Sequence, residues 1–154
     1  MAEEPSLFTR ILDGEVPANF IARGDDWAAF LDIFPRRPGH TLVIPVQQAR
    51  RIAELTPQQL ASLWGGVVES QRILSAHFHT VDFSVGIHDG PLSGQEVPHV
   101  HVHVIPREQG DGGRTLLACW PDTPPPGSGE PDHAGLSALR AEIEASNTDA
   151  GISR

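Results

Sequence analysis

Hydrophobic residues recur every three or four positions in two stretches of the chain, a spacing that predicts amphipathic helices. The first stretch is short: Ser6 is a suitable N-cap, an apolar stripe follows it, and Gly14 ends the helix. The second extends from Thr56 to about His77, where Thr56 and Gln59 form the sequence pattern of a capping box. The predicted buried face of this long helix comprises Leu60, Leu63, Trp64, Val67, Val68 and Leu74.

In other stretches hydrophobic residues alternate with polar or small ones, which predicts strands with one buried face. Residues 19–33 predict two strands joined by a turn at positions 24–26, and a further strand begins near His40 after a Pro-Gly turn. Residues 81–88 place Phe83, Val85 and Ile87 on one face. Residues 99–105 alternate histidine with valine.

Short strands, short connections and one long helix favour an α+β fold with an antiparallel sheet of about five strands and two main helices. Residues 1–108 carry this pattern and form the predicted core. Residues 109–154 are rich in glycine and proline and contain one short predicted helix within residues 132–146. We expect this C-terminal segment to be part of the same domain.

Composition narrows the range of functions. The 154 residues suffice for a real core, and the formal net charge of -9 argues against nucleic acid or an anionic membrane as the partner. All eleven basic residues are arginine, which excludes lysine Schiff-base chemistry and the lysine of a phosphate-binding P-loop. The lone Cys119 can form neither an intrachain disulfide nor a thiolate zinc cluster. The N-terminus has no signal-peptide pattern, so a cytoplasmic location is expected.

Three histidines, His99, His101 and His103, alternate with valines in the last predicted strand. On a strand they share one face, while the valines share the other and supply the core. Three interpretations follow: a solvated strand face, a zinc site of three imidazoles, or nucleophilic catalysis at phosphorus. Histidine is a weak strand former, which disfavours the first, and the set lacks the carboxylate or cysteine that many zinc sites add. In the third, one imidazole is the nucleophile while the others hold phosphoryl oxygens and fix the tautomer.

The segment HVHVHVI, residues 99–105, resembles the signature of the histidine-triad (HIT) superfamily. The resemblance extends to LFTRILDGEVPANFI, DDWAAFLDIFPRRPGHTLVIP and DGPLSGQEVPHVHVHVIPR, which together cover most of residues 6–107. It implies a HIT-like fold, a homodimer, and a nucleotide hydrolase or transferase of the Hint-like or Fhit-like branch. Such a protein cleaves a phosphoramidate or phosphoanhydride bond at the α-phosphate of a purine nucleotide through a nucleotidyl-histidine intermediate. A dinucleoside polyphosphate (Ap3A/Ap4A-type) hydrolase is an alternative.

The resemblance also implies roles for individual residues. His101 holds the place of the nucleophile, His103 that of the residue in contact with the phosphate and leaving group, and His99 a supporting place. His40 matches an outlying histidine beside the nucleophile, and Gln95 matches an amide that lines the phosphate pocket. Neither a metal nor a cofactor is implied, although a polyphosphate substrate could be bound as its magnesium complex.

A nucleoside pocket is implied in the same way. Asp32 matches a carboxylate that accepts hydrogen bonds from ribose hydroxyls; without the resemblance it reads equally as a surface acid near a turn. The residues that match the apolar wall around the base would otherwise be interpreted as ordinary core. They are Phe8, Ile11, Phe30, Ile33 and Leu42.

Two residues depart from the family pattern near the expected phosphate. His88 stands where relatives place asparagine or glutamine, and it could still donate a hydrogen bond to phosphate. Glu96 stands where serine or threonine is frequent, and because a carboxylate repels phosphate we expect it to turn outward. These departures keep open a nucleotide-binding module with negligible turnover. Arg107 and Arg114 follow the triad strand, where they either contact polyphosphate or are solvated.

Overall fold

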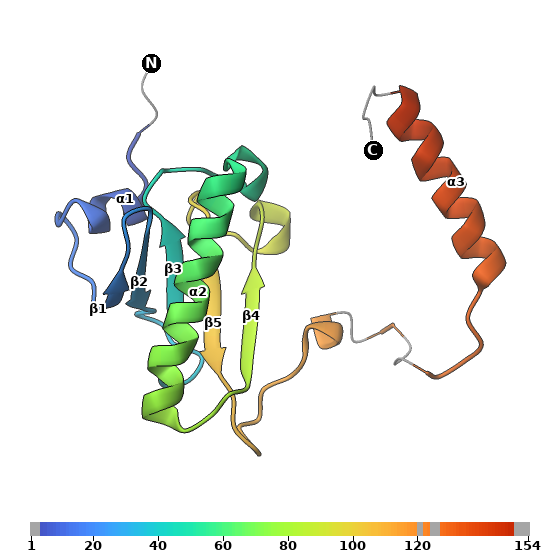
Figure 1. The fold of residues 1–154 in the computed structure, drawn as a ribbon. Helices are drawn as coiled ribbons and strands as arrows, with labels where there is room; N and C mark the ends of the chain where they lie inside the picture. The colour runs from blue at the N-terminus through green and yellow to red at the C-terminus, as the bar shows by residue number, and fades with distance from the viewer. Residues whose placement is uncertain (1–3, 120–121, 124–126, 150–154) are drawn as a thin grey trace. The chain divides into compact units, whose positions relative to one another are not determined.

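The structure, a computed structural model, describes residues 4–119, 122–123 and 127–149. The chain divides into two compact units, Met1–Arg114 and Thr115–Arg154. Figure 1 labels the helices and strands along the chain. The described residues of the first unit form α1 (Leu7–Leu12), β1 (Phe20–Arg23), β2 (Trp27–Leu31), β3 (Thr41–Pro45), α2 (Pro57–Phe78), β4 (Phe83–Ile87) and β5 (Val102–Pro106). The second unit contains α3 (His133–Asp149).

The strands of the first unit form one antiparallel sheet. Within the described residues it has five strands in the order β1-β2-β3-β5-β4, so the last strand of the sequence lies between β3 and β4. The predicted α+β class and five-stranded antiparallel sheet are confirmed. Because β5 is a central strand, its side chains have neighbours on both sides, which is where a rigid site can be built.

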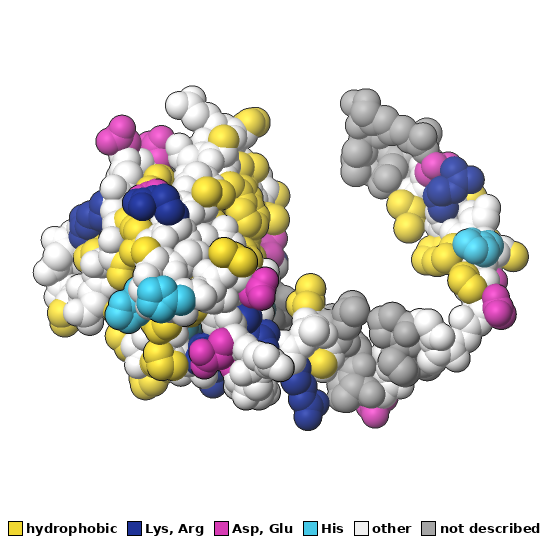
Figure 2. All heavy atoms as spheres, turned by 60° about the horizontal axis from the view of Figure 1, so that its bottom comes forward, with side chains coloured by type: hydrophobic (Ala, Val, Ile, Leu, Met, Phe, Trp, Pro, Cys, Tyr) yellow, Lys and Arg dark blue, Asp and Glu magenta, His cyan; other side chains and the backbone are white. Residues whose placement is uncertain are grey.

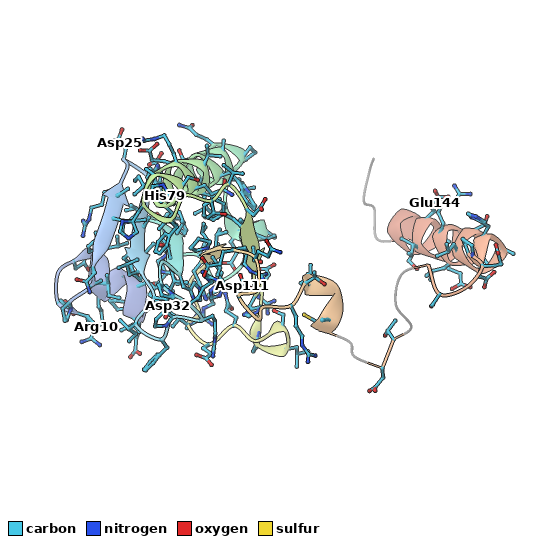
Figure 3. The ribbon with its side chains drawn as sticks, turned by 90° about the horizontal axis from the view of Figure 1, so that it is seen from below. Arg10, Asp25, Asp32, His79, Asp111 and Glu144 are labelled. Carbon is cyan, nitrogen blue, oxygen red and sulfur yellow. The ribbon has the colours of Figure 1, made fainter. Side chains whose placement is uncertain are left out.

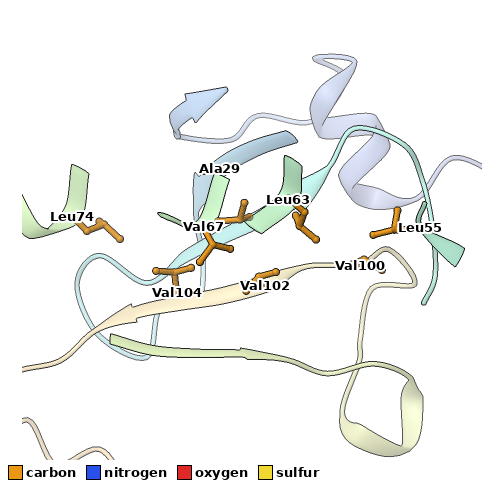
Figure 4. Close-up of a cluster of buried hydrophobic side chains, with 10 residues drawn as sticks. Ala29, Leu55, Leu63, Val67, Leu74, Val100, Val102 and Val104 are labelled. Atoms are coloured by element: carbon orange, nitrogen blue, oxygen red, sulfur yellow. The ribbon is translucent and has the colours of Figure 1, made fainter. Parts of the chain in front are cut away.

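One face of the sheet packs against α2 (Figure 1). The helix begins at the predicted capping box, in which Thr56 accepts from the backbone N–H of Gln59 and the Gln59 side chain accepts from that of Thr56. The valines of the triad segment lie in the core, as predicted, and none of the three is exposed to solvent. Figure 4 shows Val100, Val102 and Val104 beside the helix residues that cover them.

Two members of the predicted buried face of α2 lie elsewhere. Trp64 is 46% exposed and Val68 is 64% exposed. With about 100° between successive residues, they lie on the flank of the helix rather than beside Leu63 and Val67, which define its buried centre. Gly66 takes part in that contact instead, because a Cβ at this position would lie 2.5 Å from the ring of Trp27.

The other face of the sheet is covered in part by α1. The predicted N-cap is confirmed, since the Ser6 side chain accepts from the backbone N–H of Thr9. Side chains of α1, β2 and β3 form a second apolar cluster on this face, made of Phe8, Ile11, Ala28, Phe30, Leu42 and Ile44. Strand β5 lies next to this cluster, and its odd-numbered side chains occupy the same face.

The prediction that one strand carries all three histidines of the triad is wrong. Strand β5 begins at Val102, so His99 and His101 precede it and only His103 lies within it. The reason is a change of partner: the backbone N–H of Val100 donates to the carbonyl of Ala49, beyond the end of β3. The chain nevertheless remains extended enough that valines and histidines stay on opposite sides.

The second unit is described by itself. Helix α3 begins within the predicted range but continues to Asp149, beyond residue 146. Figure 2 shows hydrophobic side chains at the surface of this helix; Leu136, Leu139 and Ile143 are each more than half exposed. Across the described residues, no helix combines the length and the apolar character needed to cross a membrane.

Candidate active site

The histidines lie on the face of the sheet away from α2, next to the apolar cluster under α1. Ring centroids of His101 and His103 are 5.0 Å apart, and those of His40 and His88 lie 5.2 and 5.3 Å from His103. The Phe8 ring meets His101 edge-on at 5.2 Å. The structure therefore brings four predicted histidines and one wall residue to a single place.

His99 is held on both sides and is fully buried. Its Nε2 lies 2.9 Å from the carbonyl oxygen of Pro45, which can only accept, so Nε2 carries the proton. Its Nδ1 then accepts from the Ser6 hydroxyl, 2.7 Å away. Burial lowers the pKa of His99 below its ordinary value, which keeps the ring neutral. The solvated-face interpretation is thereby wrong for this residue.

The partners of His99 form a network at the start of α1. Ser6 caps the helix while donating to His99, and its own backbone N–H donates to the Gln48 side chain at 2.7 Å. The hydroxyl of Thr9 donates to the same Gln48 oxygen at 2.6 Å. Sequence reasoning found Ser6 as a cap but not as a partner of His99, and no local signal links residues 93 positions apart.

His101 presents one nitrogen with a free lone pair. Its Nδ1 lies 2.7 Å from the carbonyl oxygen of His99 and must donate to it, so the proton is on Nδ1 and the lone pair is on Nε2. The residue is 6% exposed, and burial is the main cause that lowers its pKa. A neutral imidazole with an unprotonated, oriented Nε2 is the form required of a nucleophile or general base.

His40 fixes the tautomer of His103. The backbone N–H of Arg36 donates to Nδ1 of His40, so Nε2 of His40 carries the proton. That Nε2 lies 2.9 Å from Nδ1 of His103 and donates to it. The Asp32 carboxylate lies 3.6 Å from the same Nε2 of His40. Burial lowers the pKa of His40, so this donor chain is neutral.

His103 consequently carries its proton on Nε2. This nitrogen is buried and has no hydrogen-bond partner among the described residues. Burial, followed by the charges of His101, His40 and His88, lowers the pKa of His103 to about 4. An unpaired buried N–H costs about 1–3 kcal/mol. The site therefore holds one unpaired donor beside one free lone pair, the pair of groups that acyl or phosphoryl transfer uses.

The remaining residues expected near phosphate lie at the edge of this site. His88 is exposed, with its ring beside His103 and over Gly94, and Glu96 is also exposed. The side-chain amide of Gln95 donates to the backbone carbonyl of Arg50 at 2.8 Å, so it holds the loop before the triad in place.

The predicted apolar wall is largely present as one cluster. Phe8, Ile11, Phe30 and Leu42 are all buried there, whereas Ile33 is 71% exposed and lies outside the cluster. Asp32 is partly buried, and one of its oxygens accepts from the backbone N–H of Phe34. Figure 3 shows Asp32 on the side of the sheet away from α2.

One group of side chains could hold a metal ion. Potential ligand atoms of Asp32, His40 and His103 lie within 4.8 Å of one another. Two imidazoles and a carboxylate are a ligand set that divalent transition metals accept. Binding would need the proton between the two histidines to leave, because their nitrogens are hydrogen-bonded to each other.

Comparisons with known proteins agree with this arrangement. The family model described as the HIT domain matches residues 13–110. An uncharacterized HIT-like protein of Methanocaldococcus jannaschii is 38% identical over 106 residues, covering 69% of this chain and 81% of the relative. The asymmetrical bis(5'-nucleosyl)-tetraphosphatase of Schizosaccharomyces pombe is 44% identical over 84 residues, covering 54% of this chain and 46% of that enzyme.

A solved structure of a HIT family protein from Bacillus anthracis matches with a TM-score of 0.74 and 26% identity, covering 99% of this chain and 100% of that one. The matched family model spans the five strands of the sheet, α2, and the histidines at positions 40, 99, 101 and 103, whereas α1 precedes it. The chain belongs to the HIT family.

Proposed function

We propose that the protein hydrolyses a phosphoramidate or phosphoanhydride bond at the α-phosphate of a purine nucleotide, with Nε2 of His101 as the nucleophile. The orientation of the His101 ring carries the proposal: Nδ1–H is fixed on the carbonyl of His99, so the lone pair belongs to Nε2. Because burial lowers the pKa of His101, the ring is neutral at pH 7 and ready to attack.

The reaction has two steps. In the first, Nε2 of His101 forms a bond to phosphorus, and the bond from phosphorus to the leaving oxygen or nitrogen breaks with its electron pair on the leaving group. A leaving amine takes up a proton from solvent as it departs. In the second, water attacks the same phosphorus, loses a proton to solvent, and the nucleoside monophosphate departs as Nε2 regains its lone pair. In both steps the unpaired Nε2–H of His103 donates to a phosphoryl oxygen, which supplies the partner that this buried nitrogen lacks.

The nucleoside would lie toward α1. The apolar cluster that contains Phe8 and Phe30 lies on this face of the sheet, away from α2. The exposed Ile33 offers a further apolar contact to a purine. The Asp32 carboxylate, beside His40, is the acceptor proposed for the ribose hydroxyls. The similarity of this chain to the bis(5'-nucleosyl)-tetraphosphatase of S. pombe is a reason to propose a dinucleoside polyphosphate, rather than an amine-linked nucleotide, as the substrate.

The test compares metal-stripped wild type with His101→Asn on an adenosine phosphoramidate, on diadenosine tri- and tetraphosphate, and on guanosine counterparts. We expect the variant to lose at least about a thousandfold in kcat/KM, as removal of a nucleophile does, while AMP still binds. Wild type mixed with radiolabelled substrate and quenched in alkaline denaturant should carry label on His101, because a phosphorus–nitrogen bond survives alkali but not acid. A wild type that binds AMP without turnover would establish a binding module instead. Activity that appears only with added metal would assign the Asp32–His40–His103 group to catalysis.

We further propose a homodimer in which β4 and the neighbouring flank of α2 meet a second copy. Strand β4 is an edge strand, and apolar side chains are exposed along it and on that flank: Trp64, Val68, Val81 and Val85. An exposed edge with apolar neighbours favours association. Sedimentation equilibrium of Val85→Lys should show monomers, whereas Val46→Lys, at an exposed valine beyond β3, should remain dimeric.

A further inference from the structure

On the face of the sheet away from α2, strands β4 and β5 extend past the triad, and α1 does not cover them there. Gly86 pairs with His103 and Ser84 pairs with Ile105 in the antiparallel register. Because side chains on one face recur every second residue, Ser84 and Ile105 lie about 7 Å beyond His103 along the strands. This direction leads to the residues that follow β5.

On β4, no side chain fills the surface between His103 and Ser84. Gly86 occupies it, and a Cβ at this position would meet no atom within 4 Å. A side chain here would stand beside the His103 ring, between the triad and Ser84. Its absence leaves room for an extended ligand to pass from one to the other.

Beyond Ser84 and Ile105 lies a pocket of about 320 Å³. Within the described part of the chain, Asp111 is the single acidic residue in its wall. The wall carries four arginines, which are Arg36, Arg37, Arg107 and Arg114. Even with Glu108, which pairs with Arg37 from outside, four guanidiniums face two carboxylates, a local charge of +2 on a chain of net charge -9.

Asp111 holds two of these arginines in place. Its carboxylate accepts from Nε and Nη2 of Arg107 at 2.7 and 2.8 Å, and from Nη1 of Arg37 at 2.8 Å. Arg107 also donates to the Ser84 hydroxyl at 2.9 Å, so its guanidinium lies over the end of the open face. Hydrogen bonds from Arg107 hold the pKa of Asp111 far below its ordinary value, and the pair stays ionised. Figure 3 shows Asp111 on the same side of the sheet as Asp32.

The other two arginines are available to a ligand. Arg36 and Arg114 are exposed and form no ion pair with any described residue. Arg36 also links the pocket to the triad, because its backbone N–H donates to His40 and its charge contributes to the lowered pKa of His40. The Nε of Arg37 is buried without a hydrogen-bond partner, a further unused donor in the same wall.

From this geometry we propose that the arginine pocket binds the phosphate chain of the leaving group. The α-phosphate lies at His101, the chain passes His103 and Gly86, and its distal phosphates meet Arg36 and Arg114. The inference rests on the proposed function and selects a polyphosphate-linked nucleotide over an amine-linked one. Guanidinium forks suit phosphate oxygens. On the face that Figure 2 shows, basic side chains are scattered among acidic and apolar ones rather than forming a broad surface, which suits a small anion better than a nucleic acid.

The test uses Arg114→Gln and the double variant Arg36→Gln/Arg114→Gln, which leave the Arg107–Asp111 pair intact. The matched control is Arg72→Gln, an arginine on α2 that pairs with Glu69. The measured quantity is kcat/KM for diadenosine tetraphosphate divided by kcat/KM for an adenosine phosphoramidate. We expect this ratio to fall about tenfold in the double variant, less in the single variant, and to stay unchanged in the control.

Binding of inorganic tripolyphosphate tests the pocket without turnover. Calorimetry would compare His101→Asn with the triple variant that also carries Arg36→Gln and Arg114→Gln. Binding that weakens about tenfold in the triple variant supports the pocket even where no substrate is turned over, and then the proposed function alone fails. Equal binding, together with an unchanged ratio of kcat/KM values, overturns the inference and leaves the proposed function standing.

Discussion

His99 and His103 lie four positions apart, and their two imidazole rings differ in hydrogen bonding. Both ring nitrogens of His99 are hydrogen-bonded, one to Ser6 and one to the carbonyl of Pro45. His103 has one nitrogen bonded to His40 and the other buried without a described partner. The repeated imidazoles are therefore not equivalent: the first is satisfied within the core, and the last keeps one N–H without a partner among the described residues.

The difference arises from what covers each ring. His99 lies at the start of α1, where the Ser6 cap closes over it. His103 lies between β3 and β4, on a part of the sheet where Leu42 and Gly86 are its neighbours across the strands. The alternating histidines thus extend from His99, which the start of α1 covers, to His103, which has only Leu42 and Gly86 as its neighbours across the strands.

Replacing each histidine by alanine should separate the two roles most strongly. His99→Ala leaves a cavity and two orphaned partners, so we expect it to lower the free energy of unfolding by about 3–4 kcal/mol. His103→Ala removes one unsatisfied donor but leaves the Nε2–H of His40 without its acceptor, so we expect a smaller loss of about 1–2 kcal/mol, with at least a hundredfold lower kcat/KM. Urea unfolding and steady-state kinetics on both variants measure the contrast. Similar stability losses in the two would show that the hydrogen bonds do not set the roles.

Lowering the pH should weaken the folded state through the buried rings. Burial lowers the pKa values of His40, His99, His101 and His103 below 6.5, so the unfolded chain takes up protons first. Stability is then complete above about pH 6.5 and is lost as the pH falls toward the pKa of His103, about 4. Between pH 7 and 5 we expect a loss on the order of 2–3 kcal/mol, measured by urea unfolding.

A variant sharpens this pH prediction. His103→Gln removes one of the four groups and should reduce the slope of stability against pH between 6.5 and 4. His133→Gln, at an exposed position of α3, serves as the control and should follow the wild type. A wild-type stability that stays level down to pH 5 would contradict neutral burial of these rings.

Ser6→Ala should weaken the closed end of the triad. It removes the α1 cap and the donor to His99 together, and we expect a loss of about 1–2 kcal/mol. The rate should fall as well, since the carbonyl of His99 orients His101. Ser62→Ala, at a partly buried serine on α2 that is bonded to Asp26, should change stability by less than about 0.5 kcal/mol. A Ser6→Ala variant as stable as this control would mean that the network adds nothing.

The sequence correctly predicted those features that depend on residues close together in the chain. The capping box at Thr56, the Ser6 cap and the buried valines each depend on residues a few positions apart, and the structure confirms them. The burial of Trp64 and Val68 was predicted wrongly, because the direction in which a helix faces depends on its partner. That partner is Trp27, which packs on Gly66, and no periodicity within α2 contains this information.

The sequence predicted which residues form the site better than it predicted the hydrogen bonds between them. Alternation places the three histidines on one side, and the family resemblance adds His40 and Asp32, which the structure brings together. The bond from Ser6 to His99 and the meeting of Arg36 with Arg107 join segments brought together only by the sheet order. Such contacts follow from topology, in which β5 inserts between β3 and β4, and not from spacing along the chain.

The smallest expected effect concerns His88, which replaces the amide that the family resemblance leads one to expect. Its ring is exposed and lies 5.3 Å from that of His103, and no hydrogen bond of its side chain occurs within the described residues. We therefore expect His88→Gln to change the free energy of unfolding by less than about 0.5 kcal/mol and kcat/KM by no more than about threefold. A glutamine amide can still donate a hydrogen bond to a phosphate oxygen, so a donor remains beside His103 in this variant. A loss of a hundredfold would instead make His88 part of the catalytic set, and the comparison between a fixed and a ready histidine would then have to include it.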